Sequence, residues 1–144
     1  MSLTFLYHGI PRGQERPRFG NRAYKSAEAK AYEQAIAVAY RQAARNAKPL
    51  EGPVGISVAA GYPIPDSDSK TKKRDKAAGM ILPVKKPDLD NVAKAVLDAL
   101  NGLAWLDDRQ VVYLYTYKVY AENPGLIVTI YSGDDLDDLK KGRE

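Results

Sequence analysis

The stretch KKPDLDNVAKAVLDALNGLAWLDD, residues 85–108, decides the fold around it. Pro87 favours extended backbone in the residue before it and cannot donate a β-ladder hydrogen bond. We therefore expect an extended lead-in, in which Asp88 and Asp90 point the same way because side chains alternate along extended backbone. Apolar residues then recur at helical spacing, which predicts a helix that stops near Gly102.

Carboxylates flank this predicted helix at both ends. Asp107 and Asp108 follow it, while Lys94 lies one helical turn after Asp90. If the chain returns after the helix towards its start, three aspartates converge into an oxygen-rich site for a hard cation such as Mg²⁺. Such an ion can activate water and neutralise a leaving oxygen. The simpler interpretation is that Asp90 only caps the helix and that Lys94 pairs with Asp98 on its surface.

The remaining chain predicts a mixed fold. Strands are expected over residues 3–10, 54–63, 110–121 and 126–131, the last two forming a hairpin. A second helix, capped by Ser26, is expected to run to about Ala47. The prediction is an α/β (α+β mixed) fold: a small mixed sheet of about four strands with two principal helices packed on it. We expect one domain over residues 1–144.

Charge is distributed unevenly along the chain, whose formal net charge is +4. Residues 1–87 carry 16 Lys/Arg against 7 Asp/Glu, and residues 88–144 carry 6 against 11. A basic half joined to an acidic cluster is typical of a nuclease, in which cations hold phosphates and carboxylates hold a metal. A solvated, slightly basic surface gives the same counts, so charge alone leaves both interpretations open.

The amino-acid composition limits which metal sites the chain can form and where in the cell we expect it. The chain has no cysteine and a single histidine, which excludes disulfides, thiolate zinc sites and His-rich metal sites. No apolar run approaches the length needed to cross a bilayer, and residues 1–6 show no signal-peptide pattern. We therefore expect a cytoplasmic protein with no membrane partner.

Basic segments provide candidates for DNA contact. Residues 11–22 read as a loop with interleaved aromatic residues, and residues 66–80 as a flexible basic loop or a short exposed helix. Arginine beside aromatic rings suits phosphate contacts and base stacking, although a charged segment is often only solvated. The charged tail, residues 133–144, is expected to fray or form a short helix. The candidate DNA-binding residues are Arg12, Arg16, Arg18, Arg22, Lys72, Lys73, Arg74, Lys76, Lys85 and Lys86.

The stretch KKPDLDNVAKAVLDALNGLAWLDDRQVV, residues 85–112, closely resembles the signature of the RusA-type Holliday-junction resolvases, which are crossover junction endodeoxyribonucleases. ERPRFGNRAYKS, residues 15–26, and the basic segment before KPDLDN also match. The resemblance implies that Asp88, Asp90 and Asp108 bind the metal and that Lys94 is the catalytic lysine. Asp107 belongs to the same motif.

The resemblance also implies a Mg²⁺-dependent homodimer that resolves four-way junction DNA by cutting two opposed strands, in recombination and repair. A two-fold dimer suits a junction that presents two equivalent phosphodiesters. Two alternatives are a non-catalytic DNA-binding protein, in which the aspartates only cap and repel phosphate, and an endonuclease for other branched DNA.

Overall fold

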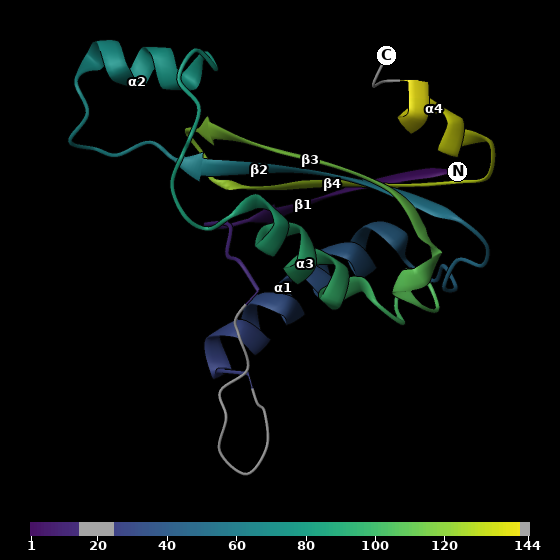
Figure 1. Ribbon diagram of the computed structural model, residues 1–144. Helices are drawn as coiled ribbons and strands as arrows, with labels where there is room; N and C mark the ends of the chain where they lie inside the picture. Colours follow the sequence, from purple (N-terminus) through teal and green to yellow (C-terminus); the bar gives the residue numbers. More distant parts are fainter. Residues whose placement is uncertain (15–24, 142–144) are drawn as a thin grey trace.

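A four-stranded sheet with two long helices on one of its faces forms the framework of the protein (Figure 1). This computed structural model describes residues 1–14 and 25–141. The strands are β1 (Ser2–His8), β2 (Val54–Pro63), β3 (Val111–Ala121) and β4 (Gly125–Ser132). The helices are α1 (Ala27–Ala44), α2 (Lys70–Ala77), α3 (Leu89–Leu100) and α4 (Leu136–Lys141), with short 3₁₀ turns η1 (Asp108–Gln110) and η2 (Gly133–Asp135). The predicted mixed sheet with two principal helices is confirmed.

The strand order is β1-β4-β2-β3, with β4 antiparallel to both neighbours and β3 parallel to β2. The predicted hairpin of β3 and β4 is therefore wrong, because β2 lies between them. Residues 122–124 span the gap, since three residues reach about 10 Å, or two strand spacings. Gly61 of β2 lies beside both ends of this connection, since an added Cβ there would lie 2.9 Å from Ala121 Cβ and 3.6 Å from the Gly125 carbonyl oxygen. Pattern reading finds strands but does not choose their neighbours.

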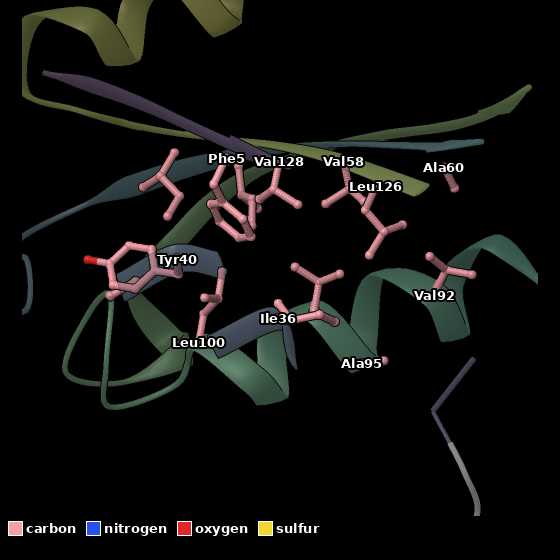
Figure 2. Packing of buried hydrophobic residues seen from close by; sticks show 14 of the residues in the cluster. Phe5, Ile36, Tyr40, Val58, Ala60, Val92, Ala95, Leu100, Leu126 and Val128 are labelled. Carbon is pink, nitrogen blue, oxygen red and sulfur yellow. The ribbon is translucent and has the colours of Figure 1, made fainter. Parts of the chain in front are cut away.

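The core lies between the sheet and the helix pair α1 and α3. Figure 2 shows Ile36 and Leu100 from the helices below Val58 and Val128 from the sheet, and all four side chains are fully buried. Removing a Leu or Ile side chain from water is worth about 1.5–3 kcal/mol. Because α3 is fixed by this contact, the position of its first turn is set by the packing of the core.

Local capping explains where two helices begin. Ser26 Oγ accepts a 3.1 Å hydrogen bond from Ala29 N, which confirms the predicted N-cap of α1. Ser69 caps α2 in the same way, and α2 has no buried residue, so the expectation of a short exposed helix is confirmed. Figure 1 shows α2 beyond the ends of β2 and β3.

The charged tail forms the short helix α4, which lies across the sheet from α1 and α3 (Figure 1). Leu139 is its buried residue and packs close to Gly55 at the start of β2. In the described part of the chain, no helix is both long enough and apolar enough to span a bilayer.

Candidate metal and DNA-binding site

The first turn of α3 carries two of the candidate metal ligands. Asp88 is the N-cap residue by its backbone (φ −66°, ψ 145°), but its side chain makes no capping hydrogen bond. Asp90 lies inside the first helical turn, and both side chains are exposed. The backbone of Asp88 is extended, as predicted for the lead-in, but the predicted alternation of Asp88 with Asp90 along extended backbone is wrong, since α3 already begins at Leu89. Acidic residues favour this position because the helix dipole stabilises negative charge at the N-terminus.

A cavity of about 740 Å³ adjoins this turn. Asp88 and Asn91 line it together with Arg12 and Lys86, so two cations and a carboxylate border the same space. A 2.8 Å hydrogen bond from Gln14 N to Asn91 O docks the segment after β1 onto α3. A DNA phosphate in the cavity would meet both cations and the Asp88 carboxylate.

Tyr32 of α1 contacts Arg12. The Tyr32 hydroxyl accepts a 3.0 Å hydrogen bond from the Arg12 backbone N, and the guanidinium lies 5.9 Å from the ring centroid. Burial raises the pKa of Tyr32 to about 12. The side chain is therefore a neutral positioning group at physiological pH, not a proton donor to substrate.

Lys94 points along the surface of α3, and its side chain is 64% exposed. Its Nζ lies 3.9 Å from Asp98 Oδ1, in agreement with the simple helix pair suggested by their spacing. Asp98 also lies 3.8 Å from Lys25 Nζ and accepts a hydrogen bond from the Gln14 side chain. Burial nevertheless raises the pKa of Asp98, even though both lysines act to lower it.

Asp98 is the residue that sequence reasoning undervalued. The i,i+4 spacing to Lys94 indicated an ion pair, but Gln14 and Lys25 come from distant parts of the chain. Their approach depends on the packing of α1 against α3, which no local pattern reports.

Asp108 lies at the far end of α3 from Asp88. Its Oδ1 accepts a 2.9 Å hydrogen bond from Nε1 of the fully buried Trp105. Asp107 caps the turn η1 by accepting from Arg109 N at 2.9 Å. A straight helix of 12 residues is about 18 Å long at 1.5 Å per residue. The negative charge of Asp108 acts on Asp98, where it adds to the effect of burial on the pKa.

The expected return of the chain towards Asp88 is therefore not found within one copy. Among residues 1–14 and 25–141, no group of three or more His, Cys, Asp or Glu side chains is placed to hold a metal ion. The physical reason is that α3 carries the chain away and β3 begins where α3 ends. Asp88 and Asp90 remain close to each other in sequence and structure, and Asp108 stands apart from them.

The basic helix α2 carries four candidate DNA-binding residues, three of which are here called the α2 cations: Lys72, Lys73 and Arg74. Arg74 is 75% exposed and lies 3.5 Å from Asp75. Lys76 on the same helix is different, because its side chain is only 13% exposed and its Nζ lies 2.6 Å from Asp68. It also lies 4.6 Å from the Tyr120 ring centroid, so its charge is engaged within the chain.

The remaining candidates lie on the chain that leads into α3 or outside the described residues. Lys85 Nζ is 5.6 Å from the Tyr120 ring, and the Lys85 carbonyl accepts a 3.0 Å hydrogen bond from Lys118 Nζ. Lys86 lines the cavity beside Asp88. Arg16, Arg18 and Arg22 fall outside the described residues.

Residues 8–131 match the model of a family described as the endodeoxyribonuclease RusA. The chain belongs to the RusA endodeoxyribonuclease family. The chain is also similar to a curated protein: the uncharacterised protein YqaN of Bacillus subtilis (strain 168) is 38% identical in an alignment of 135 residues, and the alignment covers 89% of this chain and 94% of YqaN. Membership in the RusA family supports a nuclease.

In this RusA-family nuclease, the chemistry of the first turn of α3 suits a hard divalent ion. Carboxylate oxygens are the ligands that Mg²⁺ prefers. Asp88 and Asp90 supply them on exposed side chains, and the Asp88 carboxylate is not used in a helix cap. The arrangement can therefore hold an ion at the mouth of a cation-lined cavity.

Proposed function

We propose that this RusA-family nuclease is a Holliday-junction resolvase that acts in DNA recombination and repair. It hydrolyses a phosphodiester bond in each of two opposed strands of four-way junction DNA, with Mg²⁺ as cofactor. One observation carries the proposal: the Asp88 carboxylate, which makes no capping hydrogen bond, borders the same cavity as the cations of Arg12 and Lys86, and Asp90 follows it in the first turn of α3. Cations draw in the polyanionic backbone, and carboxylates beside them hold the divalent ion.

Each candidate residue has a distinct task in this mechanism. Asp88, Asp90 and Asp108 hold Mg²⁺, which when bound lowers the pKa of a water and stabilises negative charge on the phosphate. The Lys94 ammonium stabilises charge on the phosphate or orients the attacking water. Its 3.9 Å contact with Asp98 and its high exposure leave it free to turn towards DNA.

The protein acts as a homodimer in which Asp108 of one copy joins Asp88 and Asp90 of the other. The support for this shared site is the separation of Asp108 from the first turn of α3 within a single copy. A dimer with two-fold symmetry contains two such sites, one for each of the two equivalent strands of a junction.

Recognition of the junction arms relies on phosphate contacts, and therefore on shape. Arg12, Lys85 and Lys86 contact DNA near the cavity, and the α2 cations hold an arm further out. The three arginines of residues 16–22 are expected to join them. Lys76 adds little, because its charge already pairs with Asp68.

The direct test is a nicking assay on a synthetic four-way junction, with Mg²⁺ or with EDTA. Wild-type protein is expected to cut two opposed strands only with Mg²⁺, and Asp90→Asn to bind the junction without cutting it. Asp134→Asn is the matched control, since it removes the same charge from an exposed position in the tail. Equal cleavage by a clean Asp90→Asn preparation would remove Asp90 from the site.

The preferred DNA substrate distinguishes a Holliday-junction resolvase from an endonuclease for other branched DNA. A replication fork and a linear duplex are tested beside the junction, at equal concentration and ionic strength. Preference for the four-way junction supports the proposal, whereas faster cutting of the fork would make the protein an endonuclease for other branched DNA.

A further inference from the structure

The chain that leads into α3, residues 85–87 and here called the lead-in segment, is bonded to the sheet at two points. The Tyr62 hydroxyl, near the end of β2, donates a 2.5 Å hydrogen bond to the Pro87 carbonyl oxygen. Lys118 Nζ, from β3, donates a 3.0 Å hydrogen bond to the Lys85 carbonyl oxygen. Both contacts lie directly before the first turn of α3, which carries the candidate metal ligands.

Regular structure sets the position of both donors. β2 and β3 are parallel, and their register pairs Tyr62 with Tyr120 and Ala60 with Lys118. Side chains two residues apart in a strand point to the same face, so Tyr62 and Lys118 lie on one face of the sheet. Lys118 Nζ is 5.4 Å from the Tyr62 ring centroid, and Lys85 Nζ is 5.6 Å from the Tyr120 ring centroid, both within cation–π range. The ends of β2 and β3 therefore form a fixed support for the lead-in segment.

The Tyr62 hydroxyl is held in the form that donates a hydrogen bond. The residue is only 2% exposed. Burial raises the pKa of Tyr62, and the negative charge of Asp88 adds to this effect. The phenol therefore keeps its proton at physiological pH and donates it to the Pro87 carbonyl.

We infer that Tyr62 and Lys118 are positioning residues of the metal site, which act through the backbone of the lead-in segment to fix the place of the Asp88 carboxylate. The Asp88 side chain makes no capping hydrogen bond, so the backbone before it determines where it lies. A ligand that is already in place binds an ion more tightly, because less conformational freedom is lost on binding. This role rests on the proposed function and deepens it, since it concerns the ligands of the same ion.

The competing interpretation is that both contacts only stabilise the fold. Loss of the Tyr62 hydroxyl would then lower the free energy of unfolding and leave the metal affinity of the folded protein unchanged. Tyr40 provides a matched control, because it is also a core tyrosine, 4% exposed, and packs edge-on against Phe5. For Lys118 the two effects differ in sign: removing a positive charge by itself tightens the binding of a cation, whereas losing a positioning contact weakens it.

The test compares wild type with Tyr62→Phe, Tyr40→Phe, Lys118→Met and Lys118→Arg in the absence of DNA. Binding of Mn²⁺, as a probe of the magnesium site, is measured from the electron paramagnetic resonance signal of the free ion, and circular dichroism checks that each protein is folded. Tyr62→Phe keeps the ring and loses the donor. It is expected to bind Mn²⁺ about tenfold more weakly than wild type, the lower end of the loss seen when an outer-shell partner of a metal ligand is removed.

The other variants separate positioning from stability and charge. Tyr40→Phe is expected to bind Mn²⁺ as wild type does. Lys118→Met is expected to bind it more weakly, and Lys118→Arg, which keeps a donor and the charge, to recover most of the affinity. In the nicking assay, Tyr62→Phe should need about tenfold more Mg²⁺ for half-maximal cutting and reach the wild-type rate when Mg²⁺ is saturating.

Equal Mn²⁺ affinity in folded Tyr62→Phe and Tyr40→Phe would overturn the inference, as would tighter binding by Lys118→Met or a wild type that binds no Mn²⁺. The Lys118 variants decide the matter if Tyr62→Phe does not fold. Cleavage of junctions by wild type is measured separately. If all the Mn²⁺ affinities are as expected but wild type cuts no DNA, the proposed function fails and the positioning role stands.

Discussion

A shared metal site predicts that two inactive variants restore activity when they are mixed. We consider Asp88→Asn and Asp108→Asn, which change each carboxylate without changing its shape. In Asp108→Asn the side-chain oxygen can still accept the hydrogen bond from Trp105 Nε1, so the fold around η1 is retained. Each variant alone has no intact site and is expected to be inactive.

The size of the recovery follows from the arrangement of the sites. Random association of equal amounts gives about half mixed dimers, because an isologous interface does not distinguish the copies. In each mixed dimer both substitutions fall in one site, and the other site has all three wild-type carboxylates. About one quarter of the wild-type number of sites is therefore expected, as half the dimers carry one intact site of two.

The assay is single-turnover nicking of a four-way junction by co-refolded variants in Mg²⁺. The mixture is expected to give singly nicked junctions rather than resolved duplexes, since no mixed dimer has two working sites. A mixture of Asp88→Asn with Asp90→Asn is the control, because both residues belong to the same copy and no intact site can form. Absence of recovery in the first mixture would refute the shared site.

Three further predictions test other parts of the structure. Replacing the α2 cations with alanine is expected to lower junction affinity and to reduce the slope of log K against log salt by up to about 0.9 per lost phosphate contact. The control variant Lys76→Ala is expected to leave this slope nearly unchanged in the same titration. An unchanged slope in the triple variant would show that α2 is solvated and does not contact DNA. Gly125→Ala sets a Cβ 2.4 Å from the Tyr7 carbonyl oxygen. Urea denaturation is therefore expected to show a free energy of unfolding about 1–3 kcal/mol lower than that of wild type. A variant as stable as wild type would contradict this close approach of β1 and β4. The pKa of Tyr32 is raised from 10.0 to about 12, so the folded state holds the phenol proton more tightly than the unfolded state does, and the resulting stabilisation is complete below pH 10 and is lost as pH rises to 12. The free energy of unfolding of Tyr32→Phe should therefore depend less steeply on pH in this range than that of wild type. The same pH dependence in both proteins would contradict the raised pKa.

Much of the candidate site could be proposed from the sequence because its signals are local. Asp88, Asp90 and Lys94 are candidates from the motif that opens α3, and the exposure of α2 followed from its lack of apolar periodicity. The expectations that failed were those that depended on how the chain folds in three dimensions. The predicted alternation of Asp88 with Asp90 was wrong because α3 starts one residue after Asp88. The difference between Lys76 and the α2 cations arises from Asp68 and Tyr120, which contact Lys76 in the folded chain.

The sequence by itself determined the elements and the family. Periodicity, cap residues and the signature of residues 85–112 are properties of neighbouring residues, and they locate four strands, the two core helices and the nuclease motif. Only the tertiary structure decided that β2 separates β3 from β4 and that Asp108 lies a helix length from Asp88. The physical reason is that strand pairing and helix direction depend on contacts between residues far apart in the chain, which compete in the folded core and leave no trace in local spacing.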